Sequence, residues 1–198
     1  MKYMGMPWGM WTLFAGSFQA QLTDVLGYNE QTAKAITRRA KAKYKEILSC
    51  LPEFEKGDRF KINLVGCAML GAFVLTMPER PNVDRLTEYY AKAMMTKPMR
   101  WFCRKSGEKK FTPQSVAGLQ AAAALKAADR NSYSWNMDFY EYPDGSGYEA
   151  RFTKCGICVL MRELGLYDLT PALCRLDYTM SEAGGTADFT RQYTLATG

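Results

Sequence analysis

The sequence predicts an α+β fold, in which a helical N-terminal half packs on a small, mostly antiparallel sheet with two further helices. Two observations support this prediction. Apolar residues recur at helical spacing within residues 1–131, and an aromatic segment with the alternation of a strand begins at Tyr133. We expect the 198 residues to form a single domain, in which residues 132–198 contain a hairpin, two helices and a final strand and carry the candidate site.

The first two long helices are predicted from apolar patterning. An apolar stripe opposite a basic one indicates an amphipathic surface helix over residues 31–51. A second helix over residues 58–77 is apolar nearly all round, so we place it in the core. Its uninterrupted apolar run of 12 residues is shorter than the roughly 20 residues of a membrane span, so we expect no membrane association.

Two further helices are predicted from capping residues. Asn82 is suited to cap a helix whose apolar residues keep helical spacing to Met94. Thr112-Pro113 is a good N-cap and first-position pair, and it opens an Ala-rich helix that runs to about Asp129. We interpret Pro98 and the basic stretch that follows it, residues 104–110, as a connection between these two helices.

The last third of the chain changes character. Aromatic, strand-like residues 133–142 and 148–153 flank a Pro- and Gly-containing turn, which predicts a β-hairpin. Residues 156–164 then read as a short helix ended by a glycine, and a Thr-Pro pair opens another helix over about 170–182. Residues 189–196 have the pattern of a final strand.

The absence of histidine excludes several classes of active site. With 26 Lys and Arg, 20 Asp and Glu and no His, the chain cannot form a Ser-His-Asp or Cys-His triad, and it offers no histidine ligand for zinc. Proton transfer must therefore use Cys, Asp, Glu, Lys, Tyr or water. We see no convergent spacing of carboxylates and thiols for a metal, and we expect no cofactor.

The net charge of +6 favours anionic partners only mildly. The densest basic stretch runs from Lys34 to Lys45, without interleaved aromatic residues, and we interpret it as a solvated helix face rather than a nucleic-acid site. The six cysteines are spread along a chain without a secretory signal, which is typical of reduced thiols and a cytoplasmic protein. We expect a small molecule as the partner, and the oligomeric state stays open.

The most reactive residues are expected around Cys155. This cysteine lies where the second hairpin strand meets a helix, so the helix dipole and free N–H groups can stabilise its thiolate, and Lys154 adds positive charge. Cys158 follows at C-x-x-C spacing. A single such pair is not diagnostic: two buried structural cysteines are about as consistent with it.

A second candidate group lies on the following helix, where Cys174, Asp177 and Ser181 occupy the flank of the buried stripe. A carboxylate in that place is partly desolvated, which raises its pKa unless a cation is close. A structural Asp paired with Arg is an equally good interpretation. The candidate cations are Arg175, Arg151 and Arg191.

The first hairpin strand offers polar residues on one face. Asn136 and Asp138 alternate with apolar residues and can line a polar site, although a solvent-facing position is the commoner outcome for an antiparallel sheet. Together with Arg151, which can hold a carboxylate in bidentate fashion, they are our candidate substrate-binding residues.

Three motifs in the last third resemble the L-2-amino-thiazoline-4-carboxylic acid hydrolase family. They read, in order, Phe152-Thr-Lys-Cys155, Met161-Arg-Glu-Leu-Gly-Leu166 and Leu173-Cys174-Arg-Leu-Asp177. By this resemblance Cys155, Cys174 and Asp177 match the family pattern, whereas Cys158 does not belong to it. The resemblance covers about residues 133–198. The family pattern continues into a Cys-Asp-aromatic segment beyond these residues, and if that segment helps to build the site, we expect this chain to be inactive.

The family implies hydrolytic opening of a cyclic amidine, in which water adds to the ring carbon between N and S and yields a carbamoyl-cysteine. As our own hypothesis, either the thiolate of Cys155 attacks that carbon, or Asp177 takes a proton from the attacking water, with Cys174 helping to position or activate the nucleophile. Two alternatives remain: a redox-sensing or ligand-binding protein that uses Cys155 and Cys158, and a helical module that binds an acidic partner through Lys34–Lys45.

Overall fold

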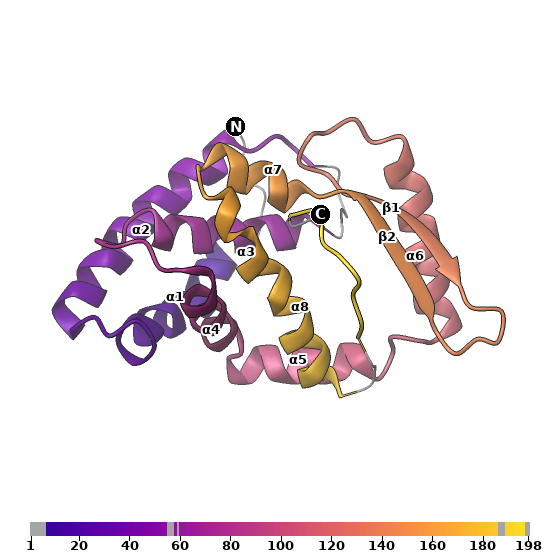
Figure 1. Cartoon of the computed structure of the whole chain (residues 1–198), viewed down its shortest axis with the longest axis horizontal. Helices are drawn as coiled ribbons and strands as arrows, with labels where there is room; N and C mark the ends of the chain where they lie inside the picture. Colours follow the sequence, from indigo (N-terminus) through magenta and orange to yellow (C-terminus); the bar gives the residue numbers. More distant parts are fainter. Residues whose placement is uncertain (1–6, 55–57, 59, 186–188, 197–198) are drawn as a thin grey trace.

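The computed structural model describes residues 7–54, 58, 60–185 and 189–196. Within these residues it confirms the α+β class, with most helices in the N-terminal half and a two-stranded antiparallel sheet (Figure 1). The elements are α1 (Pro7–Asp24), α2 (Glu30–Cys50), α3 (Lys61–Val74), α4 (Val83–Met94), α5 (Lys97–Gly107), α6 (Pro113–Ala127), β1 (Asn136–Glu141), β2 (Tyr148–Lys154), α7 (Gly156–Glu163), the 3-10 turn η1 (Tyr167–Leu169) and α8 (Thr170–Gly184).

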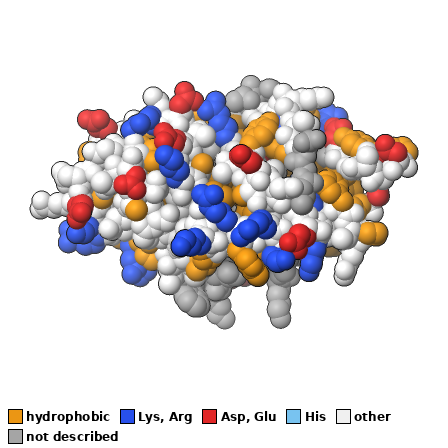
Figure 2. Space-filling view, turned by 90° about the horizontal axis from the view of Figure 1, so that it is seen from below, with side chains coloured by type: hydrophobic (Ala, Val, Ile, Leu, Met, Phe, Trp, Pro, Cys, Tyr) orange, Lys and Arg blue, Asp and Glu red, His pale blue; other side chains and the backbone are white. Residues whose placement is uncertain are grey.

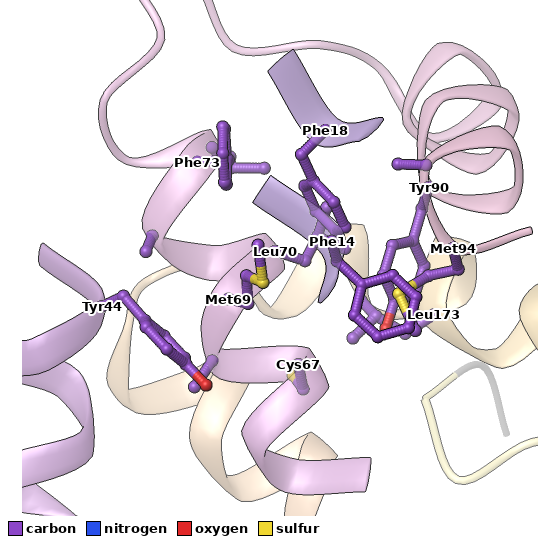
Figure 3. Close-up of a cluster of buried hydrophobic side chains, with 14 of the residues drawn as sticks. Phe14, Phe18, Tyr44, Cys67, Met69, Leu70, Phe73, Tyr90, Met94 and Leu173 are labelled. Atoms are coloured by element: carbon purple, nitrogen blue, oxygen red, sulfur yellow. The ribbon is translucent and has the colours of Figure 1, made fainter. Parts of the chain in front are cut away.

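The core is built around α3, as its apolar sequence predicts. Every residue of this helix from Leu64 to Val74 is buried. Aromatic residues of α1 and α2 and side chains of α4 and α8 surround it (Figure 3). The centres of the Phe73 and Phe18 rings lie 4.9 Å apart. Burial of each such side chain contributes on the order of 1.5–3 kcal/mol to the free energy of folding.

Two caps predicted from the sequence are confirmed. Asn82 accepts a hydrogen bond from the N–H of Arg85 at the start of α4, and Thr112 accepts one from the N–H of Ser115 at the start of α6. Each bond satisfies one of the free N–H groups of the first helical turn. The predicted helix boundaries are therefore close to the observed ones wherever a capping residue precedes an apolar stripe.

The interpretation of Pro98 and residues 104–110 as a connection was wrong for its first part. The chain there forms α5, capped by Thr96, whose hydroxyl accepts from the N–H of Met99. Pro98 is compatible with the helix because it lies in the first turn, where its missing N–H has no partner to lose. The basic residues in the last turn of α5 interact favourably with the helix dipole.

The hairpin lies at one end of the molecule, with α6 packed against β1 (Figure 1). Its strands pair in antiparallel register, with Phe139 opposite Ala150 and Asp138 opposite Arg151. Trp135 and Met137 are buried and Asp138 is exposed, which agrees with the predicted alternation.

The predicted final strand, residues 189–196, was wrong. This segment, which we call the C-terminal strap, is irregular and runs beside α8 (Figure 1). The Tyr167 hydroxyl donates to the carbonyl of Leu195 at 3.1 Å, and the Arg191 side chain donates to the carbonyl of Cys174 at 2.9 Å. Hydrogen bonds to η1 and α8 thus hold the strap where the alternating sequence suggested a sheet partner.

None of the helices in the described part of the chain has both the length and the apolar character that crossing a membrane requires.

Candidate active site

The junction between β2 and α7 places Cys155. This residue is the N-cap of α7, with an extended backbone (φ −137°, ψ 115°). The next residue must be small: a Cβ at Gly156 would lie 1.9 Å from the carbonyl oxygen of Tyr133 and 3.1 Å from the Trp135 ring. Glycine therefore lets the start of α7 approach the segment that leads into β1, and it brings Trp135 next to the cysteine.

The surroundings of Cys155 favour its thiolate. The pKa of Cys155 is lowered to about 7, first because the Cys158 thiol donates a hydrogen bond to it. Burial opposes this effect, while the backbone N–H groups of Cys158 and Ile157 and the indole N–H of Trp135 add to it. The same hydrogen bond and burial raise the pKa of Cys158, so only one thiol of the pair is expected to ionise near neutral pH.

Lys154 is not among the groups that lower the pKa of Cys155. We expected this lysine to act beside Cys155, but its ammonium group donates to the carbonyl of Asn131. The helix N-terminus and the neighbouring donors act in its place.

Helix α8 brings Cys174 to the same region. Leu173 and Leu176 are buried on this helix, and Cys174 lies half-buried beside them. Burial raises the pKa of Cys174; the charge of Arg191 lowers it, and the charges of Cys155 and Asp177 raise it. Cys155 and Cys174 are therefore close enough to influence each other's ionisation, although they lie on different elements.

Asp177 follows Cys174 by one helical turn, and Arg191 of the strap forms an ion pair with it. The Asp177 side chain is 55% exposed and that of Arg191 20% exposed. The surrounding chain raises the pKa of Asp177 by desolvation, whereas Arg191 and then Lys110 lower it. Because the carboxylate also reaches solvent, we expect it to be ionised at neutral pH.

Of the three arginines proposed as partners of Asp177, only Arg191 contacts it. Arg175 instead binds Asp84 at 2.7 Å on the surface, and Arg151 is exposed on β2. The Arg191 guanidinium also lies 5.0 Å from the Phe189 ring and 5.5 Å from the Tyr178 ring. These contacts fix the strap against α8 at Asp177.

Sequence reasoning missed two buried residues beneath the site. Cys67 of α3 is fully buried; burial raises its pKa, and the charges of Cys155 and Cys174 raise it further. Tyr90 of α4 is also buried, and its pKa is raised by burial and by Cys67 and Asp177. Both fit a core pattern in the sequence, and only the tertiary packing relates them to the site.

The three candidate substrate-binding residues lie on the hairpin, and the described structure records no contact between them and Cys155 or Asp177. Arg151 and Asp138 face each other across the strands, both exposed. Asp138 lines a shallow cavity between α6 and β1. The side-chain oxygen of Asn136 is buried and accepts no hydrogen bond from the described residues. Their role in substrate binding stays a prediction.

A cavity of about 180 Å³ lies between α5 and α8. Its lining includes Ser181, one turn beyond Asp177, and Lys110, which follows α5. Cys155 and Cys174 do not line it. Among the described residues, no three Cys, Asp or Glu side chains come together as a metal site would require.

A half-buried cysteine with a lowered pKa, near a second thiol that itself lies close to a carboxylate, is the kind of site that thiol-dependent enzymes use. The model of the L-2-amino-thiazoline-4-carboxylic acid hydrolase family matches residues 63–198, and the chain belongs to this family. The match begins near the start of α3, well before the hairpin motifs that first indicated it. No curated protein and no solved structure matched the chain.

Proposed function

We propose that the protein hydrolyses a carbon–nitrogen bond in a small cyclic amidine, similar to ring opening of L-2-amino-thiazoline-4-carboxylate to a carbamoyl-cysteine, and that Cys155 is the nucleophile. The observation that carries this proposal is the position of Cys155. Cys155 occupies the N-cap position of α7, its sulfur accepts hydrogen bonds from Cys158 and Trp135, and it lies within electrostatic range of Cys174 on α8. Membership of the hydrolase family gives the reaction class.

The chemistry divides into two steps. In the first, the Cys155 thiolate attacks the ring carbon between nitrogen and sulfur; the ring C–N bond breaks, and the released nitrogen takes up a proton. In the second, water attacks the same carbon, the bond to Cys155 breaks, and the thiolate is regenerated while the product keeps a carbamoyl group. The overall reaction consumes one water molecule and needs no cofactor.

Asp177 is proposed as the base that accepts a proton from the attacking water. It is an ionised carboxylate with access to solvent, one turn along α8 from Cys174. Its ion pair with Arg191 orients it and also weakens it as a base, which is why we assign the first attack to Cys155 rather than to a water activated by Asp177 alone. Cys174 is proposed to position the reacting thiol.

Single substitutions test these roles. We expect Cys155→Ser and Asp177→Asn each to abolish ring opening, measured as appearance of the carbamoyl product, while both variants keep the wild-type circular dichroism spectrum. Cys50→Ser is the matched control, because Cys50 is exposed at the end of α2, outside the site. Full activity of both site variants would rule out this mechanism.

A second candidate function is a thiol redox pair, and the hydrogen bond between Cys158 and Cys155 favours it. A small-molecule disulfide would be reduced to two thiols as Cys155 and Cys158 form a disulfide. A reversible Cys155–Cys158 disulfide at physiological potentials, with no ring opening, would favour this function. A single thiol of low pKa, retained after Cys158→Ser, would favour the hydrolase.

A further inference from the structure

Lys110 is a half-buried cation at the edge of the candidate site. It follows α5, and its ammonium nitrogen lies 5.8 Å from the centre of the Phe111 ring and 5.9 Å from that of Phe189 in the strap. Burial lowers the pKa of Lys110, and the nearby charge of Asp177 raises it. No described side chain forms an ion pair or hydrogen bond with this ammonium group.

The charges around Lys110 do not balance. Asp177 is the carboxylate whose charge reaches Lys110, but Arg191 already forms its ion pair with Asp177. Two cations therefore face one anion. A partly desolvated ammonium without its own counter-ion is unfavourable, and a bound anion would remove that cost.

The cavity between α5 and α8 gives such an anion a place. Its volume of about 180 Å³ is many times the roughly 10–15 Å³ that a single water needs. Lys110 shares its lining with two hydroxyl groups, Ser106 of α5 and Ser181 of α8, while Phe102 and Met180 contribute apolar surface. One ammonium and two hydroxyls on an otherwise apolar wall are suited to a small carboxylate attached to an apolar ring.

Helix α8 connects this cavity to the reacting groups. Cys174, Asp177 and Ser181 follow one another along its flank, and seven residues of helix span about 10 Å. A ring held near Cys174 and Asp177 can therefore direct an acid group along α8 toward the cavity. This direction differs from the one toward the hairpin, where the sequence had suggested Arg151.

We propose that Lys110, with Ser106 and Ser181, forms the subsite that binds the carboxylate of the substrate. The inference rests on the proposed function, because it names the group that holds the acid of a cyclic amidine carboxylate. The wider surface agrees with it, since Lys and Arg side chains gather on the face that carries α5 (Figure 2). Helix α5 carries the exposed basic residues Lys97, Arg100, Arg104 and Lys105. Such a face raises the local concentration of anionic ligands.

The test compares two ligands that differ only in the acid group: 2-amino-thiazoline-4-carboxylate and 2-amino-thiazoline without the carboxylate. We expect Lys110→Met to raise the KM of the carboxylated ring by about 10-fold to 100-fold, the loss expected for one charged hydrogen bond, with little change in kcat. The KM of the uncarboxylated ring should not change. Lys110→Arg should recover part of the loss.

Lys109→Met is the matched control, since Lys109 is the adjacent lysine and is exposed. It should leave both KM values at their wild-type level. An equal effect of Lys110→Met on the two ligands, or an effect of the same size in the control, would overturn the inference even if ring opening itself is confirmed.

Binding measured by calorimetry separates this inference from the proposed function. If the wild-type chain opens neither ring but binds the carboxylated one more tightly, and Lys110→Met removes that preference, the subsite stands and the proposed reaction fails. If the wild-type chain binds the two rings equally, the subsite is refuted, whatever the activity.

Discussion

Cys67 is a buried thiol, and Cys155 is a half-buried thiol in a neighbouring region. Their pKa values are shifted in opposite directions. Cys67 lies in the middle of α3, where the backbone N–H groups are used within the helix; burial raises its pKa, and the charges of Cys155 and Cys174 raise it further. Cys155 is the N-cap residue of α7, where donors from Cys158, the helix N-terminus and Trp135 outweigh burial and lower its pKa to about 7.

Burial raises the pKa of a thiol, and a reactive thiol needs hydrogen-bond donors aimed at its sulfur to offset that effect. We expect the α3 region to contribute mainly to stability and the α7–α8 region to carry the proposed chemistry. Substitutions in the two regions should therefore have separable effects on unfolding and on the Cys155 thiol.

The largest effect on stability is expected in the α3 region. Phe73→Ala removes a fully buried ring that contacts Phe18 and Trp11, and we expect the free energy of unfolding to fall by about 3–5 kcal/mol. The alkylation rate of Cys155 in the folded fraction should not change. Urea denaturation and thiol labelling measure the two quantities; a large change in Cys155 reactivity with little loss of stability would contradict the separation.

The next effect is expected at the junction of the regions. Gly156→Ala forces a Cβ against the Tyr133 carbonyl, and we expect it to cost about 1–3 kcal/mol and to raise the pKa of Cys155 by displacing α7. Gly16→Ala is the control, because no atom lies within 4 Å of its added Cβ, and it should stabilise α1 by up to about 1 kcal/mol. Equal outcomes for the two variants would show that the contact at Gly156 is unimportant.

A smaller effect is expected from the strap. Arg191→Met removes the ion pair with Asp177, and we expect it to cost about 1 kcal/mol and to raise the pKa of Asp177, since Arg191 holds that pKa down. Activity should then fall at a higher pH on the acid side of the pH–activity profile, because Asp177 becomes protonated at a higher pH. Arg175→Met, which breaks the exposed pair with Asp84, is the control and should leave the profile in place.

The smallest effect is expected from a single donor to the sulfur. Trp135→Phe keeps the buried ring but removes the indole N–H, so the pKa of Cys155 should rise by less than about one unit. Because the thiolate is the reactive form, activity should fall at pH values below about 7 and be unchanged well above it. The exposed Trp101 gives the control Trp101→Phe, and an identical pH profile in both variants would exclude the indole as a donor.

Local signals in the sequence predicted much of the fold. Asn82 and Thr112 marked helix starts because capping is decided by the residue itself and the next turn. The sequence did not predict α5, because Pro98 suggests a helix break, although proline is compatible with the first turn of a helix. Residues 189–196 alternate like a strand, but a strand needs a partner edge, and here hydrogen bonds to η1 and α8 hold the segment.

Local sequence signals predicted only part of the candidate site. Cys155 and its place at a helix N-terminus follow from local sequence. The approach of Cys174 to Cys155, the choice of Arg191 over Arg175, and the position of Lys110 near Asp177 depend on contacts between distant segments. No periodicity in one sequence encodes those contacts.

At the junction of β2 and α7, Cys155 is expected to ionise at a pH well below that at which an ordinary thiol ionises. The most direct measurement is the pH dependence of alkylation at Cys155, followed by mass spectrometry of its peptide in the folded protein. We predict a midpoint near pH 7, lost in Gly156→Ala and unchanged in Gly16→Ala. A midpoint near pH 9, the value of an unperturbed thiol, would contradict the account.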